Sequence, residues 1–147
     1  MESNYLLVRL GRETALFDAG VVCSVIELDM VSPVPCAPHH VVGLSAMRSR
    51  PITVIDCYRA LDLAQPEAVK GSVRLAVVVE LDHHLYALQV DEVVDVLALD
   101  AKPVAARMEL QRGWARVQRG LVDTGQGHAL LVDPVALVAG MPAAAAA

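Results

Sequence analysis

The chain has 147 residues, a net charge of −5, a hydrophobic fraction of 55% and only 3% aromatic residues. This length suits one domain that buries its own core. The charge argues against nucleic acid as a partner, since contact with phosphates requires clustered basic residues. No apolar run reaches the roughly 18 to 20 residues that a membrane-spanning helix needs, and no signal peptide is visible. We therefore expect a cytoplasmic protein without direct membrane insertion, whose three cysteines stay reduced.

The first half of the chain predicts short strands separated by turn residues. Alternating apolar residues between turn signals are typical of strands that are buried on one face. Such strands are expected at 5–10, 13–17, 21–28 (after a short helical turn), 41–47 and 52–56. Pro33, Pro35 and Pro38 exclude regular structure between the third and fourth strands, because each proline removes a backbone donor. Residues 58–63 predict one or two helical turns.

The second half repeats this pattern after a polar loop at residues 64–72. Further strands are expected at 75–81, 85–90, 93–99, 116–123 and 129–133, and a short helix at 135–138. Strands this short, with turn signals between them, are typical of an all-β barrel or sandwich. The break at 64–72 is compatible with two small barrels, although periodicity does not choose between one barrel and two. The alanine-rich segment 141–147 is expected to be a tail outside the domain.

Several short motifs follow one another in the order typical of one protein family. They are V-x-E at 25–27, P-V-P at 33–35, a glycine at 43 before A-M-R-S at 46–49, D-E-V-x-D-V-L at 91–97, G-L-V at 120–122 and L-L-V-D at 130–133. With these motifs the chain resembles the CheW-like domain over nearly its whole length.

The resemblance implies an all-β fold of two small SH3-like five-stranded β-barrels, packed together around a shared core, with short helical turns. It implies one domain over residues 1–140, made of two intertwined barrel subdomains. The boundary between the two halves of the chain is expected near residues 64–72. The implied function is that of a non-enzymatic adaptor coupling chemoreceptors, the methyl-accepting proteins, to a CheA-type histidine kinase in bacterial chemotaxis. The implied partners are the regulatory domain of that kinase and the cytoplasmic tip of a receptor. Self-association in arrays is also expected. The resemblance implies no cofactor.

Glu27 and Arg48 are the pair that the resemblance marks most strongly as partner-binding. Both are expected on neighbouring strands with their side chains together on the surface, where an ordinary exposed ion pair is the alternative. Val25 and Gly43 match the kinase-contact face. The alternatives are a core position for Val25 and, for Gly43, a backbone that bends or approaches another strand closely.

Val93 and Val96 match a strand that the family uses for receptor contact. Because side chains alternate along a strand, at most one of the two faces outward if the strand is regular. Arg107, Arg112, Arg116 and Arg119 surround Trp114. We interpret this basic run as a solvated face or, alternatively, as the rim of a site for an acidic partner, with Trp114 as an anchor.

Two alternative functions remain open from the sequence. The N-L-R-G motif of the family reads A-M-R-S at 46–49, followed by a second arginine, Arg50. This departure suggests a divergent scaffold in a non-flagellar pathway, such as pilus or surface sensing, with one partner lost or exchanged. A small metal-binding or thiol enzyme is the other alternative, built around Cys36, the histidines at 39–40 and those at 83–84, although their spacing matches no structural zinc pattern.

Overall fold

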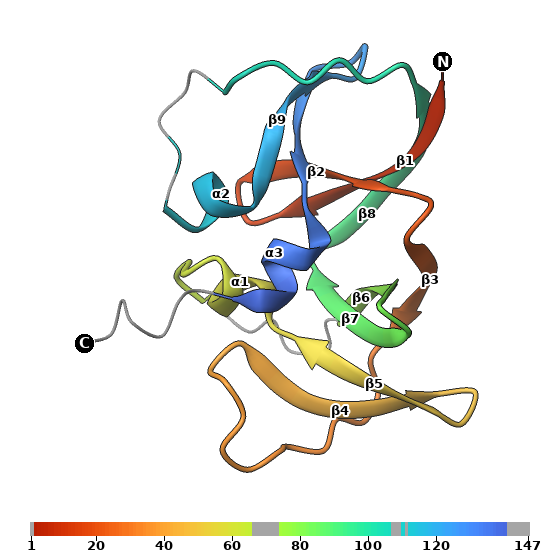
Figure 1. Cartoon of the computed structure of the whole chain (residues 1–147), viewed down its shortest axis with the longest axis vertical. Helices are drawn as coiled ribbons and strands as arrows, with labels where there is room; N and C mark the ends of the chain where they lie inside the picture. Colours follow the sequence, from red (N-terminus) through yellow and green to blue (C-terminus); the bar gives the residue numbers. More distant parts are fainter. Residues whose placement is uncertain (1, 66–73, 107–109, 111, 141–147) are drawn as a thin grey trace.

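Figure 1 shows the computed structural model, which describes residues 2–65, 74–106, 110 and 112–140. The strands form two five-stranded sheets. The first sheet has the order β8 (Glu92–Leu99), β1 (Ser3–Leu10), β2 (Glu13–Asp18), β10 (His128–Val132) and β9 (Gln118–Asp123). The second has the order β3 (Val22–Glu27), β6 (Leu75–Leu81), β7 (His84–Val90), β5 (Arg50–Ile55) and β4 (Val41–Met47). This arrangement confirms the predicted all-β fold class of two five-stranded, SH3-like units.

The chain crosses from one sheet to the other at two places. It leaves the first sheet between β2 and β3, and it returns between β7 and β8. The strands on both sides of residues 64–72, β5 and β6, belong to the second sheet. The polar loop therefore does not separate the two sheets. Residues 66–73 and the tail 141–147 lie outside the described residues.

Three short helices complete the fold: α1 (Cys57–Ala60), α2 (Arg112–Val117) and α3 (Pro134–Ala139). Asp56 and Asp133 cap the N-termini of α1 and α3. The side chain of each aspartate accepts hydrogen bonding from backbone N–H groups in the first turn of its helix. In Figure 1, α1 and α3 lie between the two sheets. The helical turn and the C-terminal helix predicted from the sequence thus correspond to α1 and α3.

Helix α2 differs from the strand that the sequence predicts from residue 116. The strand β9 starts two residues later, and α2 precedes it. Gly113 hid the helix, because glycine is a poor helix former. The structure uses it for close packing: a Cβ at Gly113 would lie 1.9 Å from the carbonyl oxygen of Leu61. The glycine therefore lets α2 pack directly on the end of α1.

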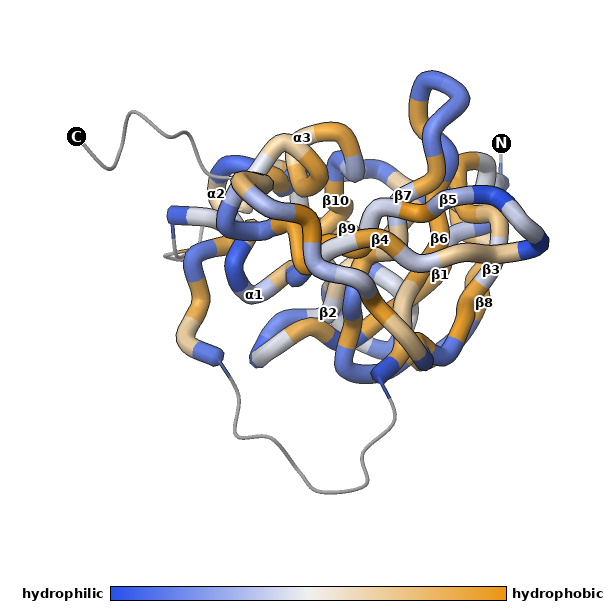
Figure 2. The backbone as a smooth tube through the Cα atoms, turned by 90° about the horizontal axis from the view of Figure 1, so that it is seen from below, coloured by the Kyte–Doolittle hydropathy of each residue, from blue (hydrophilic) through white to orange (hydrophobic). Residues whose placement is uncertain are grey.

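A shared core joins the two sheets and the three helices. Its buried residues come from the first sheet (Leu6, Val8, Leu10, Ala15, Phe17, Leu130, Val132), from the second (Ile55, Val77, Val79, Leu88, Val90) and from the helices and helix ends (Cys57, Ala60, Leu61, Trp114, Val117, Leu137). Two smaller clusters lie apart from it. One, with Leu7 and Leu16, belongs to the first sheet, and the other, with Ile52 and Val78, belongs to the second. Figure 2 shows the apolar residues along the strands and hydrophilic residues at the peripheral turns.

We expect Trp114→Ala to destabilise the protein by about 3–5 kcal/mol, because the side chain is only 2% exposed and its removal leaves a cavity in the shared core. Urea unfolding followed by circular dichroism measures the change. The control Val104→Ala truncates a side chain that is 60% exposed and should cost less than about 0.5 kcal/mol. A loss below about 1 kcal/mol for Trp114→Ala would contradict a rigid shared core.

Candidate partner-binding surface

The four edge strands of the two sheets differ in how they are covered. Ser32 lies against β4 through two hydrogen bonds of 2.8 Å with Leu44, one in each direction. Val104 covers β9 in the same way through Leu121, with hydrogen bonds of 3.0 and 2.8 Å. Within the residues that the structure describes, β3 and β8 carry no such segment. These two strands are therefore the open edges, one in each sheet.

Strand β3 presents alternate side chains to solvent. Cys23, Val25 and Glu27 are exposed, and Val25 has 41% of its surface accessible. Just beyond the strand, Leu28 donates to the carbonyl of Arg74 at 2.8 Å. Because bonded pairs alternate along an antiparallel ladder, the backbone groups at positions 25 and 27 point away from β6. The open edge of β3 thus combines free backbone groups with exposed side chains.

Strand β8 contains a β-bulge that changes which side chains face outward. Leu7 of β1 pairs with Asp95 and the next residue, Val8, pairs with Val93. Val94 is therefore the extra residue of the bulge. Val93 is half-buried against the shared core, whereas Val94 is 50% and Val96 is 60% exposed. The prediction that at most one of Val93 and Val96 faces outward assumed a regular strand, and the bulge removes that condition; Val96 is exposed and Val93 is half-buried. The bulge adds a second exposed valine beside Val96.

Gly43 lies in β4 at a point of close backbone approach. A Cβ on Gly43 would lie 2.2 Å from the carbonyl oxygen of Ser32, so any side chain would push the covering segment away. The neighbouring Leu44 is 42% exposed. The backbone approach considered from the sequence is therefore present. A contact of Gly43 with a partner stays a prediction.

Arg48 sits at the tip of the β4–β5 hairpin. Its φ is 51° and that of Ser49 is 68°, so both central residues of this two-residue turn are left-handed, as a type I′ turn requires. Glycine adopts this conformation without steric cost, and the family motif has glycine where this chain has Ser49. The turn nevertheless forms, and it leaves Arg48 exposed.

The predicted arrangement of Glu27 and Arg48 on neighbouring strands is wrong. Glu27 ends β3, which pairs with β6, and the Arg48 turn follows β4, which pairs with β5. The strands β3 and β4 are the opposite edges of the second sheet, because the parallel pairing of β5 with β7 inserts three strands between them. Among the described residues no ion pair joins Glu27 and Arg48. Arg50 instead contacts Glu80 at 3.4 Å on the surface.

The tip of the β4–β5 hairpin and the beginning of β3 line the same surface hollow. It has a volume of about 310 Å³ and is lined by Cys23, Ser24, Met47, Arg48, Arg50 and Leu85. Two guanidinium groups thus lie beside the open edge of β3. This hollow is suited to an anionic side chain, because Arg binds carboxylates through a planar set of donors.

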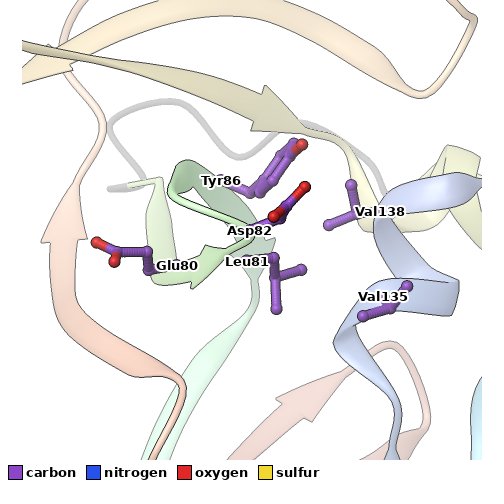
Figure 3. A pocket seen from close by; sticks show the side chains of 6 residues that line it. All are labelled: Glu80, Leu81, Asp82, Tyr86, Val135 and Val138. Carbon is purple, nitrogen blue, oxygen red and sulfur yellow. The ribbon is translucent and has the colours of Figure 1, made fainter.

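A second hollow lies between the β6–β7 hairpin and α3 (Figure 3). It has a volume of about 360 Å³ and is lined by Glu80, Leu81, Asp82, Tyr86, Val135 and Val138. The side chains of Asp82 and Tyr86 lie opposite Val138 of α3 in this view. Its surface is mainly apolar with carboxylates at one side, unlike the arginine-lined hollow at β3.

Asp91 fixes the junction between the two sheets. Its Oδ2 accepts a hydrogen bond of 2.7 Å from the backbone N–H of Gly11 and one of 2.6 Å from the hydroxyl of Tyr58. Burial, together with this hydrogen bond to a carboxylate, raises the pKa of Tyr58 to about 12. The network therefore links the β1–β2 turn, α1 and the beginning of β8.

The basic run does not form the rim around Trp114 that was the alternative interpretation, whereas Arg112 and Arg119 are exposed, as a solvated face predicts. Trp114 is buried, so its interpretation as a surface anchor is wrong. Arg116 donates to the carbonyl oxygens of Ala60 and Ala136, which ties α1 to α3, and burial lowers its pKa. Arg119 contacts Asp133 at 2.6 Å. Arg116 was not recognisable as structural, because its carbonyl acceptors are distant in sequence. Arg107 lies outside the described residues.

Of the residues in the metal or thiol hypothesis, only His40 is buried, and Cys36, His39, His83 and His84 are exposed. His40 is buried and its Nε2 donates to the carbonyl of Val138 at 2.6 Å. Cys23 and Cys36 are exposed, and burial raises the pKa of the Cys57 thiol above its ordinary value. In the described part of the chain, no group of three or more His, Cys, Asp or Glu side chains is arranged to hold a metal ion. No helix there is long and apolar enough to span a membrane.

Two five-stranded sheets around a shared core, with exposed apolar residues on two open edges, define a small all-β domain. The family model of the CheW-like domain matches residues 4–140. The chain therefore belongs to the CheW-like domain family, and its role is that of a chemotaxis coupling adaptor.

Two relatives give the degree of similarity. The chemotaxis protein CheW of Treponema pallidum (strain Nichols) is 24% identical over 128 residues, which cover 85% of this chain and 75% of that protein. The crystal structure of the scaffolding protein TtCheW from Thermoanaerobacter tengcongensis superimposes with a TM-score of 0.76 at 19% identity and covers 90% of each chain. This second likeness shows the fold.

We expect Tyr58→Phe to lower stability by about 1–2 kcal/mol at pH 7, because Asp91 loses a hydrogen-bond donor. The raised pKa favours the neutral hydroxyl in the folded state. Its contribution is fully present below pH 10 and is lost as the pH rises from 10 to 12. Urea unfolding by circular dichroism at pH 7 to 11.5 should show a steeper alkaline loss in the unmodified chain than in Tyr58→Phe. Equal slopes would contradict this role, and Tyr5→Phe serves as the control.

Proposed function

We propose that this chain is a cytoplasmic, non-enzymatic adaptor that binds the regulatory domain of a CheA-type histidine kinase and the cytoplasmic tip of a chemoreceptor. Residues 1–140 act as one domain in this proposal, because the chain returns to the first sheet after completing the second. The observation that carries the proposal, beside family membership, is the presence of one open edge in each sheet. Two separate edges allow two partners to bind at once.

The kinase surface in this proposal belongs to the second sheet. It comprises Val25 and Glu27 on the open edge, Gly43 on the opposite edge and Arg48 at the hairpin tip. The arginine-lined hollow supports grouping Arg48 with β3, since Cys23 of β3 lines it as well. Exposed charges of this kind contribute mainly to partner choice and association rate.

The receptor surface in this proposal lies on β8 of the first sheet, at Val93 and Val96. The bulge supports this assignment, because it exposes Val94 as well as Val96 and makes a small apolar patch. A receptor tip is a helical coiled coil, and an apolar patch suits the apolar face of a helix. Each contact is expected to be small and weak, and repetition in an array strengthens it.

We expect Arg48→Glu to weaken binding to the kinase regulatory domain by at least about tenfold, which corresponds to about 1.4 kcal/mol. Isothermal titration calorimetry measures the affinity. The melting temperature should change by less than about 2 °C, because Arg48 is exposed and makes no ion pair within the described residues. The control Arg12→Glu reverses another exposed charge, on the β1–β2 turn, and should bind normally. Full-strength binding by Arg48→Glu would contradict the kinase surface.

We expect Val96→Lys to abolish or strongly reduce binding to a receptor-tip fragment while kinase binding is retained. The reason is that a charge would replace a valine at the centre of the apolar patch on β8. Val135→Lys is the matched control, since Val135 is also 60% exposed but lies on α3. If both variants lose receptor binding equally, the receptor surface does not lie on β8.

A divergent scaffold with one partner lost or exchanged is the second candidate. The observation in its favour is the hairpin at Arg48, where Ser49 replaces the family glycine and Arg50 is engaged with Glu80 of the same chain. Parallel titrations with both partners distinguish the two candidates. Binding of only the kinase or only the receptor would select the divergent scaffold.

A further inference from the structure

We propose that the hollow between the β6–β7 hairpin and α3, here called the α3 hollow, binds an arginine side chain that projects from a partner protein. Its volume is about 360 Å³. Six side chains line it (Figure 3): Glu80, Leu81, Asp82, Tyr86, Val135 and Val138. The proposal goes beyond the adaptor function, because neither of the two proposed partner surfaces includes any of these residues.

Helix α3 gives the α3 hollow an apolar wall. Val135 and Val138 form it, and Val135 is 60% exposed. The helix is held in place, because Leu137 belongs to the shared core and Nε2 of His40 donates to the carbonyl of Val138 at 2.6 Å. The wall therefore exists before any partner binds. An exposed apolar wall of this kind suits the aliphatic stem of a long side chain.

Asp82 gives the α3 hollow an available negative charge. It is the first central residue of the two-residue turn between Leu81 and His84. Its φ is 51° and that of His83 is 64°, as a type I′ turn requires, so the position of Asp82 is well defined. Asp82 is exposed, and among the described residues no ion pair includes its carboxylate. A cation from outside the chain can therefore pair with it.

The apolar wall and the carboxylate together favour arginine as the occupant. A purely apolar side chain would take water from the carboxylate of Asp82 without replacing its hydrogen bonds. An arginine meets both requirements, because its stem is aliphatic and its planar guanidinium forms two parallel hydrogen bonds to one carboxylate. A guanidinium also stacks on aromatic rings, which an ammonium group does less well, and Tyr86 lines the same hollow.

Glu80 is a second carboxylate of the α3 hollow, and Arg50 holds it back. In Figure 3 the side chain of Glu80 points away from α3. Its Oε2 lies 3.4 Å from Nη1 of Arg50, in an exposed ion pair. Such a pair is weak, so an arginine of a partner can compete with Arg50 for Glu80. Loss of Arg50 and loss of the Glu80 charge therefore have opposite effects on binding.

Titration of the full chain with a model peptide tests the proposal. The probe is acetyl-Ala-Leu-Arg-Leu-Ala-amide, and the backbone chemical shifts of the isotope-labelled chain report where it binds. We expect saturable shifts on the β6–β7 hairpin and α3, with a dissociation constant of about 1 mM. The same peptide with citrulline in place of arginine has nearly the same shape but no charge. It should bind at least about tenfold more weakly.

Three variants of the chain identify the contacts. Asp82→Asn should weaken peptide binding at least about fivefold, because the available carboxylate is lost. Asparagine adopts the left-handed conformation readily, so the turn is retained. Glu80→Gln should weaken binding about twofold, whereas Arg50→Gln should strengthen it about twofold, because Glu80 is then released. A structural disturbance of the surface would not produce these opposite changes.

Asp29→Asn is the matched control, since Asp29 is an exposed carboxylate just after β3, and it should leave the affinity unchanged. The proposal is overturned by any of three results: no saturable shift up to about 10 mM peptide, equal affinity for the citrulline peptide, or full affinity in Asp82→Asn. Shifts confined to other parts of the surface also overturn it. The titration contains neither kinase nor receptor, so its failure is distinct from a failure of the proposed function.

Discussion

The shared core is the constraint on which the rest of the structure depends. Apolar side chains of both sheets and all three helices meet in it, and the chain reaches it twice from the first sheet, through β1–β2 and again through β8–β10. Separation of either sheet from the shared core would expose Phe17, Trp114 and their neighbours to water. The core therefore fixes the two sheets relative to each other and leaves their outer edges to carry function. A coupling adaptor requires this rigidity, because it holds two partners at a defined spacing.

The edges are controlled by different local devices. A proline-rich segment covers β4 through Ser32, and the segment at Val104 covers β9. Bulges at Cys23 and Val94 twist the remaining edges, which limits indiscriminate pairing while exposing particular side chains. The outcome is one open edge that exposes Val25 and Glu27 beside two arginines, and one that exposes two valines together with the carboxylates of Glu92 and Asp95. This difference in chemistry between β3 and β8 supports two different partners more directly than the position of any single residue does.

The helices add polar links that hold the sheets at their junction. Arg116 binds carbonyl oxygens from α1 and α3, and Asp91 binds the β1–β2 turn and Tyr58. These groups had no recognisable role in the sequence. Their partners lie up to 80 positions away along the chain, and only folding brings them together. Trp114 was misinterpreted for the same reason, since an aromatic residue among arginines has the composition of an interface and here belongs to the core.

The sequence by itself determined the strands and the all-β class, because the period of two in apolar residues and the turn residues between them are local properties. It also determined, through the resemblance of its motifs, the family and the strands on which Val25, Glu27, Gly43, Val93 and Val96 lie, whereas Arg48 lies in the turn after β4. Only the tertiary structure decided which strands are neighbours. Register and strand order depend on long-range pairing, so Glu27 and Arg48 belong to opposite edges, although sequence order suggested adjacent ones. Helix α2 likewise required Leu61 as a packing partner, because its glycine gives no local helix signal.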